Sequence, residues 1–180
     1  EGWTEISQTL ALTHPAAEVW QHLQDYELVA RCLPGATIDT LEGDNITGRF
    51  RAALGPITAE FHGNAAIERS DADRRGQFRG SGSEKSGATT TKGELAYTVR
   101  EAGGGCEVDL SIKYQIQGRL AQFTRSGIVV DFVERLTGEF AKNLGAAIAG
   151  EEVAPTSKAL QVGGMFFAVL WARIKRLFGG

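Results

Sequence analysis

The middle of the chain alternates between apolar and polar positions. From about residue 36 to residue 116 the period is two, and clusters of glycine and acidic residues divide this stretch into six segments. Within residues 57–67 the odd positions are apolar or small and the even positions include polar side chains, and within residues 106–116 the even positions are apolar. One buried and one solvated face are typical of an antiparallel sheet. The sequence therefore predicts six consecutive strands joined by hairpins.

An opening strand and helical segments flank these strands. Residues 3–13 are mostly β-branched or alternating and predict an opening strand, which ends at a His-Pro pair and is followed by two short helices over residues 16–25 and about 27–32. Large apolar residues recur every three to five positions through residues 119–149 and predict one long helix that covers the sheet. The predicted fold class is α+β: a curved, seven-stranded antiparallel sheet wrapped around a long C-terminal helix, with two short helices after the first strand.

Small residues occupy part of the apolar face of the predicted strands. They are Gly63, Ala65, Gly80, Gly82 and Gly93. Small side chains leave space between a curved sheet and the helix that it grips, although they could also relieve strain in a solid core. We expect a cavity, because small-molecule sites are preferentially apolar concavities.

The walls of such a cavity would be aromatic and aliphatic with a few hydroxyl groups. The candidate ligand-binding residues are Phe61, Phe78, Tyr97, Tyr114, Phe123, Phe132 and Leu136. A surface of this kind suits a lipid-like or quinone-like molecule, which is held by apolar contact area with one or two hydrogen bonds at its head.

The sequence offers little catalytic chemistry. No pair of carboxylates and no pair of histidine and acid converges on the predicted inner face, and His62 has the parity of the solvated face. Cys32 and Cys106 are far apart and belong to no Cys-x-x-Cys motif, so we expect neither a disulfide framework nor a metal site. We expect the protein to lie in a reducing compartment. We expect no catalytic residue, no metal and no covalently bound cofactor.

The last 30 residues differ in character from the rest of the chain. The whole chain carries 19 basic and 22 acidic residues and a net charge of −3, which argues against nucleic-acid binding. Residues 151–159 are polar and predict a linker, whereas residues 160–178 combine apolar and aromatic residues with a basic cluster. Because the uninterrupted apolar part is shorter than the roughly 20 residues that span a bilayer, we predict a basic amphipathic helix lying on the membrane surface.

Eight residues of this tail are the predicted membrane contacts. They are Phe166, Phe167, Leu170, Trp171, Arg173, Ile174, Lys175 and Arg176. Docking of the tail on a partner protein, or back onto its own domain, would also cover its apolar side.

Several short segments resemble one protein family. They are Pro-Ala-Ala-Glu-Val-Trp at residues 15–20, the following Asp25, Cys-Leu-Pro-Gly-Ala at 32–36, Leu-Ala-Gln-Phe at 120–123 and Phe-Ala-Lys-Asn-Leu at 140–144. They are similar to the carbon monoxide dehydrogenase CoxG family, within the START-like, polyketide-cyclase-like (SRPBCC) superfamily with the helix-grip fold. The similarity covers about residues 3–149. It implies an accessory protein of a carbon monoxide dehydrogenase-type molybdenum hydroxylase, connected with membrane attachment or electron transfer and without molybdopterin, flavin or iron–sulfur clusters of its own.

The leading hypothesis combines the resemblance with the residue patterns. A helix-grip domain over residues 1–150 would hold a hydrophobic ligand, such as the respiratory quinone menaquinone, behind a gate formed by Leu33, Pro34 and Gly35, unless this loop is only a turn. The tail would hold the protein at the inner face of the cell membrane, peripheral and cytoplasmic, beside a carbon monoxide dehydrogenase-like partner. Two alternatives stay open: a ligand-free recruitment or assembly factor with a filled core, and a cyclase- or hydratase-like enzyme with a titratable group in the cavity.

Overall fold

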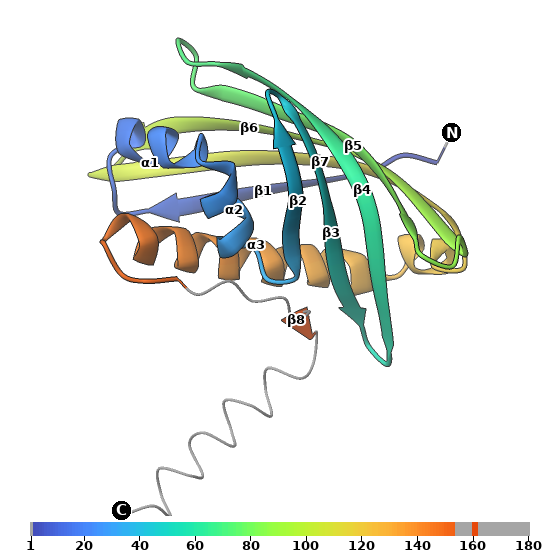
Figure 1. Cartoon of the computed structure of the whole chain (residues 1–180). Helices are drawn as coiled ribbons and strands as arrows, with labels where there is room; N and C mark the ends of the chain where they lie inside the picture. The colour runs from blue at the N-terminus through green and yellow to red at the C-terminus, as the bar shows by residue number, and fades with distance from the viewer. Residues whose placement is uncertain (1, 154–159, 162–180) are drawn as a thin grey trace, which may run out of the picture.

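The computed structural model describes residues 2–153 and 160–161, and these form a curved sheet that grips one long helix (Figure 1). The strands are β1 (Thr4–Leu12), β2 (Ala36–Glu42), β3 (Asn45–Leu54), β4 (Ile57–Ser70), β5 (Arg75–Glu84), β6 (Thr89–Ala102), β7 (Gly105–Gly118) and β8 (Leu160–Gln161). The helices are α1 (Ala16–Leu23), α2 (Tyr26–Cys32), the short 3-10 helix η1 (Ala121–Arg125) and α3 (Gly127–Ile148). The predicted fold class is confirmed.

The sheet is antiparallel in the order β1-β7-β6-β5-β4-β3-β2. Each pair from β2 to β7 that is consecutive in the chain is joined by a short turn, so the six predicted hairpin strands are all present. The alternation also gives the correct faces: Phe61, Gly63 and Ala65 of β4 share one face with Gly80 and Gly93 of the neighbouring strands, as their cross-strand register shows. In Figure 1 α3 runs along one face of the sheet, and α1 and α2 close one end of it.

The long helix is shorter than the pattern predicted. A continuous helix over residues 119–149 was expected, but the chain forms η1 first, and Ser126 is extended with ψ at 152° before α3 begins. The cause is the attachment of the preceding segment to the sheet. The backbone amide of Arg119 donates to the carbonyl of Ala88, and that of Leu120 donates to the Thr89 hydroxyl, so the helix starts only once the chain is released from β6.

Three clusters of buried apolar side chains hold the layers together. The largest lies beneath α1 and α2 and joins them to β1, β6, β7 and the end of α3, with Trp20 and Leu144 among its members. Two smaller ones pack the start of α3 against the sheet, one around Phe132 and one around Val129. The small residues predicted on the inner face are only partly buried.

The chain returns to the sheet after α3. Leu160 and Gln161 pair in parallel with Ala52 and Ala53 of β3, just beyond the point where β2 stops pairing with this strand. These two residues were expected to open a helix over residues 160–178. They form a strand instead, because the end of β3 has an unpaired edge there. The predicted linker residues 154–159 and the rest of the predicted tail helix lie outside the described residues, and no helix within the described part is long and apolar enough to cross a bilayer.

Candidate functional site

The middle of the inner face is a floor almost without side chains. Six small residues from β3, β4, β5 and β6 lie in two neighbouring rows across the sheet. They are Gly48, Gly63 and Gly82 in one row of cross-strand neighbours, and Ala65, Gly80 and Gly93 in the next. We name these six residues the glycine floor. Because the strands bring these positions into register, residues far apart in the sequence form one surface with almost no side chains.

A cavity of about 440 Å³ lies on the glycine floor and is open to solvent. All five small residues that the sequence singled out line it. Its larger apolar lining residues, which come from six strands, are Ile38, Ile46, Phe50, Phe61, Phe78, Leu95, Ile112 and Tyr114. All of its lining residues come from strands, so the cavity lies on the sheet and no residue of α3 borders it.

Glycine is present at the individual floor positions for different structural reasons. A Cβ atom at Gly63 would collide with the carbonyl oxygen of Ser81, and one at Gly80 would collide with that of Asn64, so close approach of the backbones requires glycine at both positions. At Gly93 the nearest atom to a Cβ would be the Lys113 carbonyl oxygen at 3.6 Å, an ordinary contact. Neither backbone conformation nor packing demands glycine at residue 93. What the missing side chain preserves there is space.

Three of the seven predicted ligand-binding residues line this cavity, namely Phe61, Phe78 and Tyr114. Tyr97 is only 5% exposed and lies behind Phe78, with ring centroids 5.9 Å apart and planes 29° from parallel. The remaining three, Phe123, Phe132 and Leu136, pack near the start of α3 and do not line the cavity. Helical spacing showed that these residues face the sheet, but it could not show which end of the sheet they cover.

The sequence analysis also missed lining residues. Ile46, Phe50, Leu95 and Ile112 have the same strand parity as the glycines beside them, so the alternation that identified the floor would have identified them too. A contact between any of these side chains and a ligand stays a prediction.

The proposed gate is a turn fixed at both ends. Gly35 has φ at +93°, and its carbonyl accepts a hydrogen bond of 3.0 Å from the amide of Arg51. The side chain of Asn143 on α3 donates to the carbonyl of Cys32 at 3.0 Å. Leu33, Pro34 and Gly35 are absent from the cavity lining, which begins at the next residue, Ala36. This geometry supports the interpretation of the loop as a turn, and a gating role stays a prediction.

One carboxylate on the inner face escaped the sequence analysis. Glu84 shares the parity of Gly80 and Gly82, its side chain is 9% exposed, and its Oε2 accepts a hydrogen bond of 2.7 Å from Arg119. Hydrogen bonds from Arg119 and, secondarily, Thr89 lower the pKa of this carboxyl below its usual value. Glu84 does not line the cavity. Its ion pair connects β5 to the segment before η1, which is a structural task.

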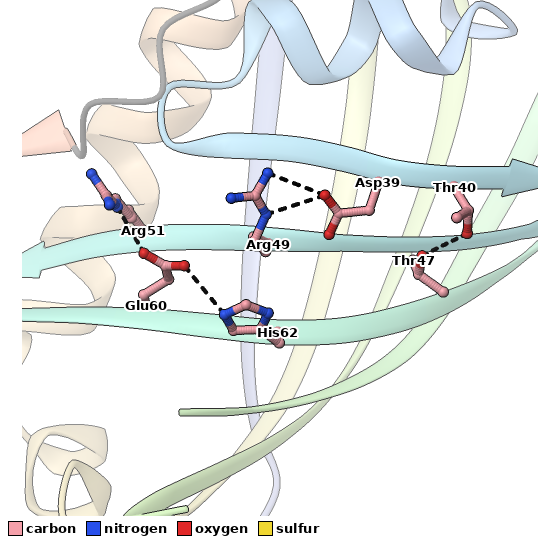
Figure 2. A network of polar contacts seen from close by, with 7 residues as sticks. All are labelled: Asp39, Thr40, Thr47, Arg49, Arg51, Glu60 and His62. Carbon is pink, nitrogen blue, oxygen red and sulfur yellow. Dashed lines mark hydrogen bonds and ion pairs between the residues drawn. The ribbon is translucent and has the colours of Figure 1, made fainter. Parts of the chain in front are cut away.

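The outer face of the sheet carries paired charges. Figure 2 shows Arg51 beside Glu60, and Glu60 beside His62, with the Nε2 of His62 3.2 Å from a carboxylate oxygen of Glu60. The hydrogen bond from Arg51 lowers the pKa of Glu60. His62 therefore faces solvent, as the alternation predicted.

No cluster of histidine, cysteine and acidic residues in the described part of the chain could hold a metal ion. Cys32 and Cys106 are free and buried, and burial raises the pKa of both thiols.

Comparison with solved structures shows the fold. A conserved protein from Geobacillus kaustophilus matches with a TM-score of 0.65 at 14% identity, over 82% of this chain and 96% of that one. The ZhuI aromatase/cyclase from Streptomyces sp. R1128 matches with a TM-score of 0.56 at 13% identity, over 82% and 94% of the two chains. Norcoclaurine synthase from Thalictrum flavum gives 0.54 at 14% identity, over 82% and 95%. At such identities the likeness establishes the helix-grip fold alone.

Comparison with family models is more specific. A search of curated proteins gave no match. The model of the carbon monoxide dehydrogenase protein CoxG matches residues 9–149, which include β2 to β7, both short helices and α3. This span contains every strand that supplies the glycine floor. The chain therefore belongs to the carbon monoxide dehydrogenase CoxG family.

Proposed function

We propose that this protein binds a hydrophobic molecule in the cavity on the glycine floor and links a carbon monoxide dehydrogenase to the membrane. Membership of the family implies an accessory role for that enzyme. The observation that carries the ligand proposal is Gly93, where the protein keeps open space that neither backbone nor packing requires. A residue that served only the fold would be expected to fill this space, since protein interiors are close-packed.

The cavity favours a flat, largely apolar ligand. Its volume of about 440 Å³ lies within the range of about 300–1,000 Å³ that is usual for small-molecule sites. The floor lets a ring system lie against the backbone, and Phe61 and Phe78 lie on the strands that border it. A respiratory quinone such as menaquinone has this chemistry, with a flat ring that bears two carbonyl oxygens and an apolar chain that could leave through the open side.

We propose binding without catalysis. The ionisable residues beside the cavity, such as Glu94 and Lys113, have the outward parity of their strands, and Glu94 pairs with Arg79 on the outer face. The inward carboxylate of Glu84 is held as an anion by Arg119 and lies outside the lining. General acid–base catalysis needs a titratable group within hydrogen-bond reach of the reacting atoms. In this proposal the functional small molecule is the bound ligand, and no metal or covalent cofactor takes part.

The membrane link rests on the composition of the tail. Aromatic and basic residues between Phe166 and Arg176 suit the headgroup region, where each basic side chain near anionic lipid contributes about 1 kcal/mol. We propose a peripheral position on the cytoplasmic face. Removal of residues 151–180 is expected to release the protein from anionic vesicles in a sedimentation assay, and equal sedimentation of the truncated and full-length proteins would contradict a membrane role for the tail.

The ligand is tested by mass spectrometry of an organic extract from the natively purified full chain. An isoprenoid quinone near one-to-one stoichiometry is expected. The variant Gly93→Leu should lose it, because leucine fills the cavity without a backbone clash. Gly138→Leu is the matched control, since it places the same side chain on the exposed side of α3, and it should retain the ligand. An empty extract from protein that still binds the enzyme would leave the ligand-free recruitment factor as the function.

A further inference from the structure

A buried hydroxyl group lies next to the cavity without a hydrogen-bond partner. The Oη of Tyr97 is inaccessible to solvent and pairs with no donor or acceptor in the part of the chain that the structure describes, and the residue as a whole is only 5% exposed. Buried polar groups are nearly always hydrogen-bonded, and each exception requires an explanation. Burial raises the pKa of Tyr97 to about 12, so the phenol keeps its proton at any physiological pH and can donate it in a hydrogen bond.

Aromatic side chains and a glycine pack closely around this hydroxyl. Gly76 lies directly across from Tyr97 on β5, and a Cβ atom at residue 76 would collide with the tyrosine ring and its oxygen. Trp20 packs on the Tyr97 ring with centroids 5.9 Å apart. Tyr26, whose oxygen accepts a hydrogen bond of 2.9 Å from Arg69, is close enough to influence the pKa of Tyr97. The hydroxyl therefore lies in an aromatic pocket with a guanidinium group near its edge.

One side chain belongs to both this pocket and the cavity. Phe78 lines the cavity, stacks on Tyr97 and meets the Tyr26 ring edge-on, each at a centroid distance of 5.9 Å. On the inner face of β5 it is flanked by Gly76 and Gly80, so no neighbouring side chain of that strand supports it. Displacement of this ring from its place beside Tyr97 would open the cavity to the Tyr97 hydroxyl.

We propose that the Tyr97 hydroxyl is the hydrogen-bond donor for the oxygen-bearing end of the ligand, and that Phe78 is the movable partition that the ligand displaces to reach it. The inference rests on the proposed function, because it assumes that the cavity holds a hydrophobic molecule. The inference adds which end of the ligand the protein recognises. It also adds the chemical class of the ligand, which is a flat apolar molecule with a hydrogen-bond acceptor such as a carbonyl oxygen. The apolar remainder would then lie over Gly80 and Gly93 toward the open side.

Two probes of the same shape test the hydrogen bond. Equilibrium dialysis of the full chain would compare 2-methyl-1,4-naphthoquinone with 2-methylnaphthalene, which has the same carbon skeleton and no carbonyl oxygen. Tyr97→Phe is expected to weaken binding of the quinone about three- to tenfold, as for one neutral hydrogen bond, and to leave binding of methylnaphthalene unchanged. The substitution removes an unpartnered hydroxyl only, so the thermal midpoint should not fall.

The matched control is Tyr114→Phe. Tyr114 is also a buried tyrosine of the inner face, it lines the cavity, and its hydroxyl is likewise buried without a hydrogen-bond partner in the described part of the chain. It lies on the side of β1, where Thr4 is directly across from it, so it is the competing donor for a ligand that points the other way. The preference for the quinone should survive this substitution. If Tyr114→Phe reduces the preference and Tyr97→Phe does not, the ligand points the other way and the inference is wrong.

The remaining outcomes separate the inference from the proposed function. If the wild-type chain binds both probes and Tyr97→Phe leaves both constants unchanged, the inference fails while a ligand-binding cavity stands. If the wild-type chain binds neither probe, the proposed function fails and the inference falls with it.

The role of Phe78 as a movable barrier is tested by the rate at which a ligand associates. Phe78→Ala, or Phe78→Leu if the alanine variant does not fold, should speed association of 2-methyl-1,4-naphthoquinone several-fold in stopped-flow measurements of tryptophan quenching. An unchanged or slower association rate in a folded variant would overturn the role of Phe78.

Discussion

The end of the inner face beneath α1 and α2 and the glycine floor obey the same strand alternation but are filled differently. Beneath α1 and α2 the inward positions hold Tyr97, Val99 and Val108, which pack with Trp20 and Leu144 into the largest core cluster. A few residues further along β6, the inward position is Gly93 of the floor, and a cavity replaces the core. The strands continue through both regions without interruption. We therefore expect stability to come mainly from the packed clusters, while the glycine floor between these strands stays open.

This comparison predicts that substitutions at the packed end and on the glycine floor change the free energy of unfolding in opposite directions. The largest effect is expected at the packed end, where the Leu144 side chain is completely buried. Leu144→Ala should lower the free energy of unfolding by about 2–5 kcal/mol, because it leaves a cavity that the cluster cannot close. Urea unfolding followed by circular dichroism measures this loss. A loss below about 1 kcal/mol would show that the cluster does not dominate stability.

The ion pair at the far end of β5 predicts a dependence on pH. Arg119 lowers the pKa of Glu84 in the folded protein below its usual value of 4.5. A carboxyl whose pKa is lowered by folding stabilises the protein above the unfolded pKa, and this stabilisation is lost as the pH falls through the folded pKa.

Glu84→Gln should therefore reduce the loss of stability between pH 6 and pH 3 relative to wild type. Unfolding curves of both proteins across this range provide the measurement. A steeper loss in the variant would contradict the sign of the pKa shift.

Filling the cavity on the glycine floor should raise the free energy of unfolding instead of lowering it. Gly93→Leu places a side chain in open space and replaces a glycine in a strand, so the free energy of unfolding should rise by about 0.5–1 kcal/mol. The exposed Gly138→Leu of α3 measures the gain from replacing glycine alone. Destabilisation of Gly93→Leu by about 1–3 kcal/mol, as seen in overpacked cores, would mean that the cavity is already filled in solution.

The outer face should respond least. Arg49 and Asp39 form an ion pair at 3.1 Å with side chains 44% and 41% exposed. Exposed pairs contribute little, so Arg49→Ala should change the free energy of unfolding by no more than about 0.5 kcal/mol. Thermal melts at low and high salt check this. A larger change would show that the outer face contributes to stability, which the comparison attributes to the core.

Much of the fold was predictable because it depends on local chemistry. Turn residues such as Gly43, Gly55 and Gly103 have positive φ and lie between strands, where the pattern placed the hairpins. The parity of each strand also followed from alternation. The family resemblance, based on residues 15–20, Asp25 and the segments at 32–36, 120–123 and 140–144, is confirmed.

The site was less predictable, because it depends on which residues lie opposite one another. Tyr97 and Gly76 meet only through the register of β5 and β6, and no local pattern shows that Phe78 lies between Tyr97 and the cavity. Phe132 was expected at the cavity and packs near Ala52 and Leu54 instead, because the break at Ser126 sets where α3 begins. Long-range geometry of this kind is absent from the spacing of residues along one segment.

The glycine floor also has an electrostatic consequence. A second, polar hollow of about 310 Å³ lies against the same stretch of sheet and shares Gly63, Gly82 and Thr91 with the cavity. Between the two hollows the protein is one layer of backbone thick. Because charge is stabilised far better near water than deep within a protein, a molecule on the floor would have high-dielectric solvent a few ångströms beyond its ring.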